Sequence, residues 1–228
     1  MEYDKAMRKF LKILKKTFPR FVLATFVIEV EKHLKGCRSI LDVGCGNNSA
    51  IGLLEEKYIT VGIDAYKPAI EDSKKRKIHD AYILGDIKKL NSLVKKKSFD
   101  AVLALDVIEH LKKDDGYKLL DNMEKVARKR VILVTPNGFI PQYNKNNKLQ
   151  AHLSGWTVKD FINKGYEVEG IYGTKFCNIL RTDEAGLRWR PKFFWGLIWG
   201  IMVEITHHLY TKRNPEFSIG LLVVKKIS

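Results

Sequence analysis

The sequence predicts an α/β fold in which a mainly parallel sheet is covered by helices on both faces. The first observation is a buried strand, Ile40–Val43, that runs directly into a glycine-rich turn at Gly44 and Gly46. The second is a further apolar strand that ends in Asp64, twenty residues after Gly44. The third is a regular alternation of apolar strands and amphipathic helices along most of the chain. Alternation of this kind predicts parallel strands with ligands bound beyond their carboxyl ends.

The glycine turn is the expected ligand site. Glycine allows backbone conformations that are closed to other residues and lets a ligand approach the main chain. We expect a helix to begin near Ser49 and to point its free amide groups at the same place. The pattern lacks the third glycine of the dinucleotide fingerprint, because Asn47 and Asn48 follow Gly46. The spacing to Asp64 suits a carboxylate that binds ribose hydroxyls.

The remaining elements follow in order. Basic and apolar residues from Met1 to Lys16 predict an amphipathic helix with a cationic face, and a second helix is expected from Pro19 to just before Gly36. Pro68 begins a helix that ends near Ile78, and Thr157 has the capping-box form that starts a helix ended by Gly165. The expected strands after Asp64 are 81–84, 99–105, 131–134, 166–173 and 217–225.

Composition indicates one globular domain. The chain has 228 residues with 29% charged and 45% hydrophobic residues, which excludes a disordered or fibrous protein. A net charge of +15 favours contact with RNA or an anionic membrane surface, although solvated lysine-rich helix faces explain it equally well. The three cysteines lie far apart at 37, 45 and 177, and no signal peptide is evident. A cytoplasmic protein is therefore expected, with membrane association left open.

Several motifs together carry a family resemblance. They are Asp42-Val-Gly-Cys-Gly46, the acid Asp64, Gly85-Asp86, Asp106-Val-Ile-Glu-His-Leu111 and Thr135-Pro-Asn137. In this order they resemble class I S-adenosylmethionine-dependent methyltransferases, with a domain of the type 11 or type 23 kind. The resemblance implies a Rossmann-like sheet of seven strands whose last strand is antiparallel. It also implies S-adenosylmethionine as the methyl donor.

The resemblance divides the single domain, residues 1–228, into three parts. These are an N-terminal helical cap (1–36), a Rossmann-like core (37–175 and 216–228) and a helical insertion (176–215). It further implies a set of cofactor-binding residues at the ends of the first four strands: Asp42, Gly44, Cys45, Gly46, Asp64, Ala65, Asp86, Ile87 and Leu105. Asp86 is expected to hold the adenine amino group, and it could equally cap a helix.

His110 is the candidate general base. Its side chain titrates near neutral pH and follows the fourth strand, at the expected crevice. Glu109 and His152 complete the candidate catalytic set. The alternative is that His110 only caps the local helix. Trp156 and Tyr143 are candidates for stacking on a flat substrate, although packing in the core or in the 139–149 loop explains them as well.

A metal site is a further hypothesis. If a helix begins at Asp106, then Asp106, Glu109 and His110 share one face, and His152 could join them from the loop above. Such a set suits a divalent ion such as Mg²⁺ or Mn²⁺. It resembles the Glu-x-x-Glu-His motif of ubiquinone-pathway O-methyltransferases and of small-RNA 2′-O-methyltransferases, with Asp106 in place of the first Glu. The alternative is a cluster that is only hydrogen-bonded.

The stretch 193–209 is apolar on every face over much of its length but too short to span a bilayer. Gly196 and Gly200 form a GxxxG motif, which permits close helix contacts. Three interpretations remain open, namely a buried lid helix, a homodimer contact and a peripheral membrane anchor.

The sequence thus predicts an S-adenosylmethionine-dependent methyltransferase that acts on an oxygen of a small or lipid-like molecule. One alternative is an RNA methyltransferase of the 2′-O type. Another, from a different class, is a binding or assembly protein that keeps the fold without catalysis.

Overall fold

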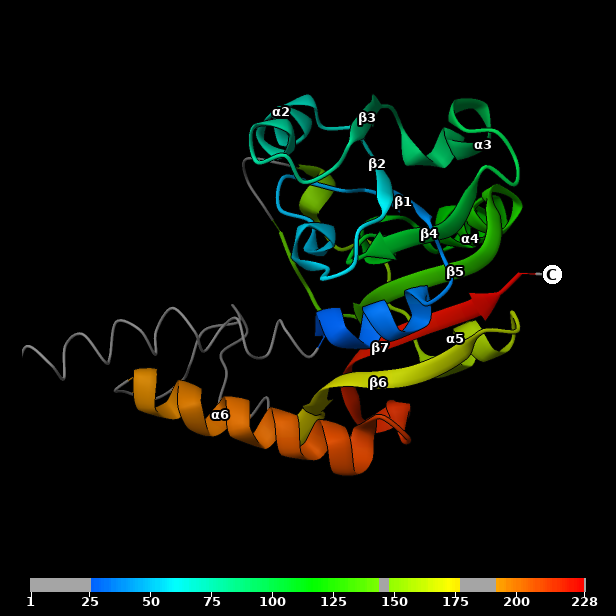
Figure 1. Ribbon diagram of the computed structural model, residues 1–228. Coiled ribbons are helices and arrows are strands. Elements are labelled where there is room, and N and C mark those ends of the chain that lie inside the picture. The colour runs from blue at the N-terminus through cyan, green and yellow to red at the C-terminus, as the bar shows by residue number, and fades with distance from the viewer. Residues whose placement is uncertain (1–25, 144–147, 177–191, 228) are drawn as a thin grey trace, which may run out of the picture.

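The computed structural model describes residues 26–143, 148–176 and 192–227. Within them, seven strands form one sheet in the order β3-β2-β1-β4-β5-β7-β6 (Figure 1). The strands are β1 (Ser39–Val43), β2 (Ile59–Asp64), β3 (Ala81–Leu84), β4 (Phe99–Leu105), β5 (Ala127–Pro136), β6 (Glu167–Thr174) and β7 (Ser218–Lys226). The pairs from β3 to β5 are parallel, and β7 is antiparallel to both of its neighbours. This confirms the predicted sheet and its antiparallel last strand.

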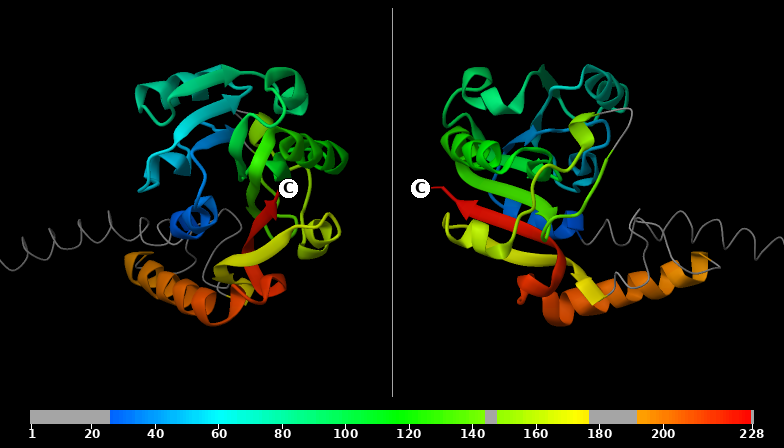
Figure 2. Two further views of the ribbon diagram at one scale, coloured as in Figure 1. Left: turned by 45° about the vertical axis from the view of Figure 1, so that its right-hand side comes forward. Right: turned by 180° about the vertical axis from the view of Figure 1, so that it is seen from behind.

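Helices cover both faces of the sheet (Figure 2). The α-helices are α2 (Lys67–Lys75), α3 (Leu90–Leu93), α4 (Lys113–Val126), α5 (Val158–Ile162) and α6 (Lys192–Thr206). Short 3₁₀ turns are η1 (Ala50–Leu53), η2 (Ile87–Lys89), η3 (Ile108–His110), η4 (Lys148–Gln150) and η7 (Pro215–Phe217), and η6 (His207–Thr211) is a π-helical turn. A further helix is described over residues 26–34 and ends before Gly36, as expected. The helix expected over residues 1–16 lies outside the described residues.

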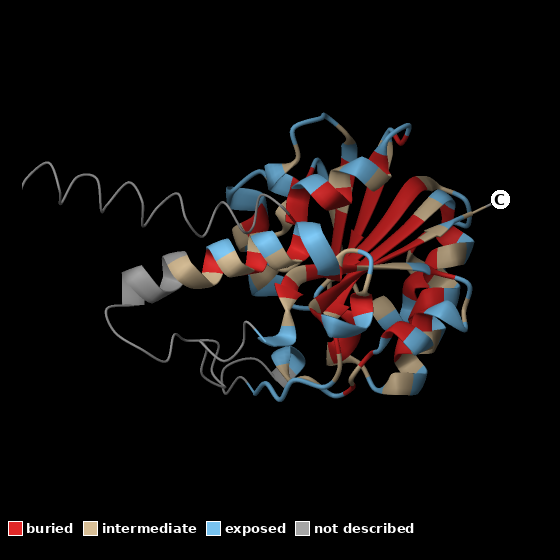
Figure 3. Cartoon of the chain, turned by 90° about the horizontal axis from the view of Figure 1, so that it is seen from below, coloured by how far each residue is buried: buried red, intermediate tan, exposed pale blue. Residues whose placement is uncertain are grey.

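Two apolar clusters flank the sheet because alternate residues of a strand point to opposite faces. Leu41 and Val43 of β1 belong to the cluster that α4 and α5 cover. Ile40, which directly precedes Leu41, belongs to the cluster that the 26–34 helix covers. The central strands are accordingly buried from both sides, as the largely red sheet of Figure 3 shows. This buried sheet is the rigid support on which the loops at its carboxyl edge stand.

The segment after the glycine turn differs from the prediction. Instead of an α-helix from Ser49, the chain forms only the short turn η1, which Ser49 caps. The backbone N–H groups of Glu55 and Glu56 donate to Oε1 of Glu31 on the neighbouring helix, at 2.9 and 2.8 Å. This competing acceptor holds the chain away from a continued helix. The expected contribution of a helix N-terminus to ligand binding is therefore wrong at this position.

Candidate functional site

A cavity of about 830 Å³ opens at the carboxyl ends of β1, β2, β3 and β4. Gly44, Gly46, Asp64, Asp86 and His110 all line it, although they come from four separate segments of the chain. Ala65 and Ile87 also belong to the lining. Asp106, from the metal hypothesis, lines it too. Sequence reasoning did not propose the other lining residues as site residues: Asn47, Tyr66, Pro68, Ala69, Asp72, Lys88, Val107, Leu111, Lys112, Asp115, Leu149, Gln150 and Leu153. Most of them lie within two residues of a predicted site residue, and this proximity in sequence is the signal that could have found them.

The glycine turn requires both of its glycines. Gly44 and Gly46 have φ values of +74° and +56°, in the left-handed region that favours glycine. A Cβ atom on Gly44 would lie 2.7 Å from a methyl carbon of Val107. The turn is further fixed because the N–H groups of Gly44 and Cys45 donate to the Ile63 carbonyl, at 2.7 and 2.9 Å. The β1 turn and the β4 loop therefore meet at the floor of the cavity.

Asp64 joins the ends of β1 and β2. Its Oδ2 accepts a hydrogen bond from the Gly46 N–H at 2.9 Å, and its Oδ1 accepts one from the Tyr66 N–H at 2.7 Å. A carboxylate offers about four lone-pair sites, so capacity remains on both oxygens. The half-exposed side chain lines the cavity, where it is free to accept bonds from the hydroxyls of a ligand.

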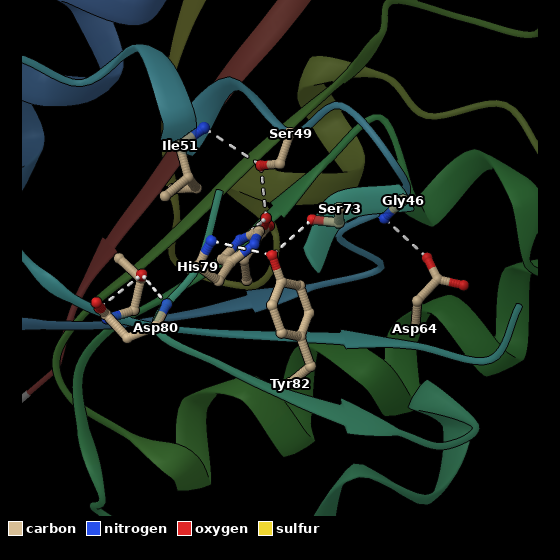
Figure 4. A network of polar contacts seen from close by, with 10 residues as sticks. Gly46, Ser49, Ile51, Asp64, Ser73, His79, Asp80 and Tyr82 are labelled. Carbon is tan, nitrogen blue, oxygen red and sulfur yellow. Dashed lines mark hydrogen bonds and ion pairs between the residues drawn. The ribbon is translucent and has the colours of Figure 1, made fainter. Parts of the chain in front are cut away.

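Asp42 lies behind the glycine turn in a buried network. Its Oδ2 accepts bonds from Ser49 Oγ at 2.6 Å and from His79 Nε2 at 2.9 Å. Because a carboxylate only accepts, His79 must carry its proton on Nε2. Figure 4 shows His79 beside Tyr82, whose hydroxyl accepts a bond from the His79 backbone N–H at 3.1 Å. The sequence offered no signal for His79, because an isolated histidine has no motif around it.

Three of the predicted cofactor residues do not line the cavity. Asp42 is 1% exposed, and its carboxylate supports the loop from behind. Cys45 is buried, and burial raises the pKa of its thiol. Leu105 packs against the apolar cluster below the 26–34 helix. Any contribution of these three residues to ligand binding is therefore indirect.

Asp86 caps a turn, as one of its two expected roles requires, and its role toward a ligand stays a prediction. Its Oδ1 accepts a hydrogen bond from the Lys88 N–H at 3.0 Å, so it caps η2. It also lines the cavity together with Ile87. A ligand in the cavity would meet Asp64 at the end of β2 and Asp86 at the end of β3.

The other side of the cavity is formed by the segment after β4. Asp106 has a φ of +54°, and the 3₁₀ turn η3 begins only at Ile108. The expectation that a helix begins at Asp106 is therefore wrong. The left-handed residue turns the chain, so Asp106 and His110 reach the cavity while Glu109 points into the protein.

Two carboxyl groups in this segment hold their protons unusually strongly. Glu109 is 3% exposed and accepts a hydrogen bond from Thr135 Oγ1 at 3.0 Å. Burial, with a smaller contribution from the charge of Asp106, raises the pKa of Glu109 to about 8. Although Asp106 is open to the cavity, the surrounding protein raises its pKa to about 6. Near neutral pH, Glu109 is thus mainly uncharged.

His110 is held as a neutral imidazole whose Nδ1 faces a backbone carbonyl. Its Nδ1 lies 3.2 Å from the Ala151 carbonyl oxygen. A carbonyl only accepts, so Nδ1 carries the proton and Nε2 keeps its lone pair. Burial lowers the pKa of His110 below its ordinary value. An imidazole lone pair in a cavity is suited to accept a proton.

His152 arrives beside His110 from the loop after β5. The N–H groups of Leu153 and Ser154 donate to the Glu109 carbonyl at 2.8 and 3.1 Å, which ties this loop to η3. The two imidazole centroids lie 4.9 Å apart. His152 Nδ1 donates to the Ile140 carbonyl at 2.6 Å, so Nε2 keeps the lone pair of the neutral ring. The loop therefore completes the side of the cavity that Asp106 and His110 begin, here called the acceptor side.

One ligand atom from each of Glu109, His110 and His152 lies within 4.8 Å of the others. A divalent ion is compatible with this donor set, because imidazole and carboxylate suit such ions and both histidines have Nδ1 fixed by a carbonyl. Asp106 does not belong to this group. The predicted metal set is thus reduced to three residues.

The two candidate stacking residues have different positions. Trp156 is fully buried, stacks on Phe161 and donates from Nε1 to Ser154 Oγ at 2.9 Å. It is a core residue, which agrees with the packing alternative and not with stacking on a substrate. Tyr143 is 70% exposed in the loop after β5 and does not line the cavity.

Comparisons with known proteins agree with this architecture. Residues 41–135 match the family model described as a methyltransferase domain. The ubiquinone biosynthesis O-methyltransferase of Rickettsia typhi is 30% identical over 128 residues, which are 54% of this chain and 47% of that protein. The protein of that name from Pelagibacter ubique is 32% identical over 127 residues, with 52% and 47% covered. These matches span about half the length of the curated relatives.

Among solved structures, a SAM-dependent methyltransferase from Archaeoglobus fulgidus superimposes with a TM-score of 0.60 at 17% identity, covering 91% of this chain and 93% of that one. A small RNA methyltransferase gives a TM-score of 0.58 at 16% identity, covering 90% and 25%. These likenesses concern the fold. Residues 41–135 therefore resemble the methyltransferase domain family, and the chain has the fold of the S-adenosylmethionine-dependent methyltransferases.

Proposed function

We propose that the protein binds S-adenosylmethionine in the 830 Å³ cavity and transfers its methyl group to an oxygen of a small or lipid-like molecule. One observation carries this proposal: His110, whose Nδ1 is bonded to the Ala151 carbonyl, lines the same cavity as Gly46, Asp64 and Asp86. A nucleoside held by the two acids would lie beside a proton acceptor. The resemblance of residues 41–135 to the methyltransferase domain family supports the choice of cofactor.

Bound S-adenosylmethionine would supply an electrophilic methyl group on a sulfonium. The chain would contribute binding and orientation, since alignment alone can lower the barrier by several kcal/mol. His110 Nε2 accepts the hydroxyl proton of the substrate as the oxygen–methyl bond forms and the methyl–sulfur bond breaks. The Ala151 carbonyl keeps the proton on Nδ1 and thereby holds the ring in the reactive tautomer.

The character of the cavity supports a partly apolar substrate. Leu149 and Leu153 line the cavity and are both 56% exposed. Phe139 and Ile140, from the same loop, are also exposed, at 57% and 39%. The curated relatives are named for ubiquinone biosynthesis, which agrees with a substrate that carries a hydroxylated ring and an apolar part.

The Glu109, His110 and His152 triad supports a second version of the same reaction. A divalent ion held by this triad would lower the pKa of a substrate hydroxyl and make a protein base unnecessary. The two versions exclude each other at one atom, since His110 Nε2 cannot both bind an ion and accept a proton. The triad and the +15 charge also favour the 2′-hydroxyl of RNA as an alternative acceptor.

The test combines binding and transfer. Calorimetry of the full chain with S-adenosylhomocysteine should show saturable binding of one molecule. The protein should then be incubated with methyl-labelled S-adenosylmethionine and separate lipid, RNA and small-metabolite fractions, each with and without EDTA. Label in lipid or small metabolites that survives EDTA supports the proposal, and EDTA-sensitive label supports the metal version. Label in RNA favours the alternative acceptor, and no binding at all would refute the proposal and favour a non-catalytic protein.

A further inference from the structure

An exposed apolar face runs along α6 and the turn that follows it. Its members, here called the α6 outer face, are Ile201 (49% exposed), Ile205 (53%), Leu209 (77%), Tyr210 (44%) and Phe217 (54%). Ile201, Ile205 and Leu209 are four residues apart, so they lie along one side of the helix. The Tyr210 and Phe217 rings are adjacent, with centroids 5.7 Å apart. Exposed apolar patches of this kind mark sites of interaction.

The opposite face of α6 is already occupied by the sheet. Val203 and His207 are each 1% exposed. Thr206 Oγ1 accepts a hydrogen bond from the Thr174 N–H at 3.2 Å. A Cβ atom on Gly173 of β6 would lie 2.7 Å from Val203 Cα, so strand and helix are in close contact. The helix is therefore fixed in place by one face and presents the other outward.

Gly200, the second glycine of the GxxxG motif, is also buried. A second copy of the chain therefore cannot approach closely along this glycine. It would have to contact the bulky side chains of the outer face instead. This weakens the interpretation of α6 as a GxxxG dimer contact.

Among the described residues, no helix is long and apolar enough to cross a bilayer. The α6 outer face nevertheless combines aliphatic side chains with a tyrosine at one end, the composition of a helix that lies in the interface of a membrane. Arg213, just beyond this end, and Lys175, at the end of β6, are both exposed. With a chain charge of +15, these cations favour a surface of negative charge.

The position of α6 relates this face to the cavity. β6 and β5 run in the same direction, since each is antiparallel to β7. The end of β6 that holds α6 therefore lies at the carboxyl edge of the sheet, where the cavity opens. Figure 1 shows α6 extending outward beyond this edge. The α6 outer face and the cavity therefore share this edge, with α6 beside the edge strand β6 and the cavity at the ends of β1 to β4.

We infer that the α6 outer face binds the surface of an anionic lipid bilayer, with its apolar side chains inserted at headgroup depth. The protein would then be a peripheral membrane protein without a spanning helix. The inference concerns docking and is independent of whether methyl transfer occurs.

The test is flotation of the full chain with vesicles. One set contains phosphatidylcholine with one third phosphatidylglycerol, and the other contains phosphatidylcholine alone. We expect binding to the anionic vesicles that weakens with added salt. The double variant Ile205→Glu/Leu209→Glu should reduce this binding by at least about tenfold, because two apolar side chains no longer enter the interface.

The matched control is Ile59→Glu/Ile162→Glu. It adds the same two charges at isoleucines that are 66% and 57% exposed on β2 and α5, and it should bind vesicles like the parent chain. Unchanged unfolding temperatures would show that both variants fold. Equal loss in both double variants would overturn the inference, as would absence of wild-type binding to anionic vesicles. A dimer in light scattering that only Ile205→Glu/Leu209→Glu dissociates, without vesicle binding, would identify a second copy as the partner instead.

Discussion

The two sides of the cavity are built in different ways. The cofactor side consists of strand ends whose acids are tied to nearby backbone or to buried partners, such as Asp64 to Gly46 and Asp42 to His79. The acceptor side brings together η3 and a loop about 40 residues later, and its carboxyl groups have raised pKa values. The cofactor side resembles a preformed binding site, whereas the acceptor side contains groups whose protonation can change near neutral pH. Changes on the cofactor side should therefore alter binding, and changes on the acceptor side should alter the rate.

The largest expected effect comes from His110→Ala. Loss of the proposed base should lower the methyl-transfer rate by about 10²- to 10⁴-fold while the Kd for S-adenosylhomocysteine stays within about threefold. Single-turnover kinetics and calorimetry measure the two quantities. His208→Ala, at an exposed histidine on η6, is the control and should change neither. If His110→Ala weakened binding as much as it slowed transfer, the division between the two sides would fail.

Asp64→Ala should have the next largest effect, which we expect on the binding of S-adenosylhomocysteine and not on the transfer rate. The Gly46 and Tyr66 N–H groups would lose their hydrogen-bond acceptor. The hydroxyls of a bound ribose would lose a charged acceptor. Hydrogen bonds to charged groups contribute about 1.5–3 kcal/mol, so the Kd should rise by about 10- to 100-fold. Glu71→Ala, on the exposed side of α2, should leave the Kd unchanged in the same titration. An unchanged Kd for Asp64→Ala would contradict the proposed ligand position.

His79→Ala tests whether support from behind the glycine turn matters. Asp42 would keep Ser49 but lose its imidazole donor inside the protein. We expect a loss of about 1–3 kcal/mol in the free energy of unfolding and a Kd for S-adenosylhomocysteine raised by about tenfold or less. His79→Gln keeps a donor at a similar distance, so it should restore most of both quantities. Equal defects in the two variants would show that imidazole shape, rather than the bond to Asp42, is needed.

The last prediction concerns the pH dependence of stability on the acceptor side, where the binding of S-adenosylhomocysteine should change least. The folded-state pKa of Glu109, about 8, is above its unfolded value of 4.5, so the folded protein binds the extra proton between these values. Stability should therefore fall as pH rises from 5 to 8, by roughly 2–4 kcal/mol relative to Glu109→Gln. Urea unfolding of both proteins in EDTA measures this difference.

A constant difference between the two proteins from pH 5 to 8 would show that Glu109 is not held protonated. Adding Mn²⁺ at pH 8 provides the matching control for the metal version. Stabilisation of the parent chain but not of Glu109→Gln would indicate an ion at the triad, since a bound ion requires the charged carboxylate.

The cofactor side could be predicted largely from the sequence. A strand, two glycines and an acid twenty residues later are local features, and parallel strands place their carboxyl ends at one edge whatever the loops do. This is why Gly46, Asp64 and Asp86 line one cavity as expected. The errors on this side, such as the missing helix after Ser49, arise from a distant partner, because Glu31 captures two backbone N–H groups.

The sequence by itself determined the strands, their mainly parallel direction and the strand ends that form the cofactor side, because hydrophobic periodicity and glycine turns act over a few residues. Only the tertiary structure decided that Asp106 turns the chain away from a helix, that His152 rather than Asp106 joins Glu109 and His110, and that Trp156 belongs to the core. Each of these depends on contacts between segments far apart in the chain. The raised pKa of Glu109 likewise follows from burial. This burial requires the loop after β5 to pack against η3.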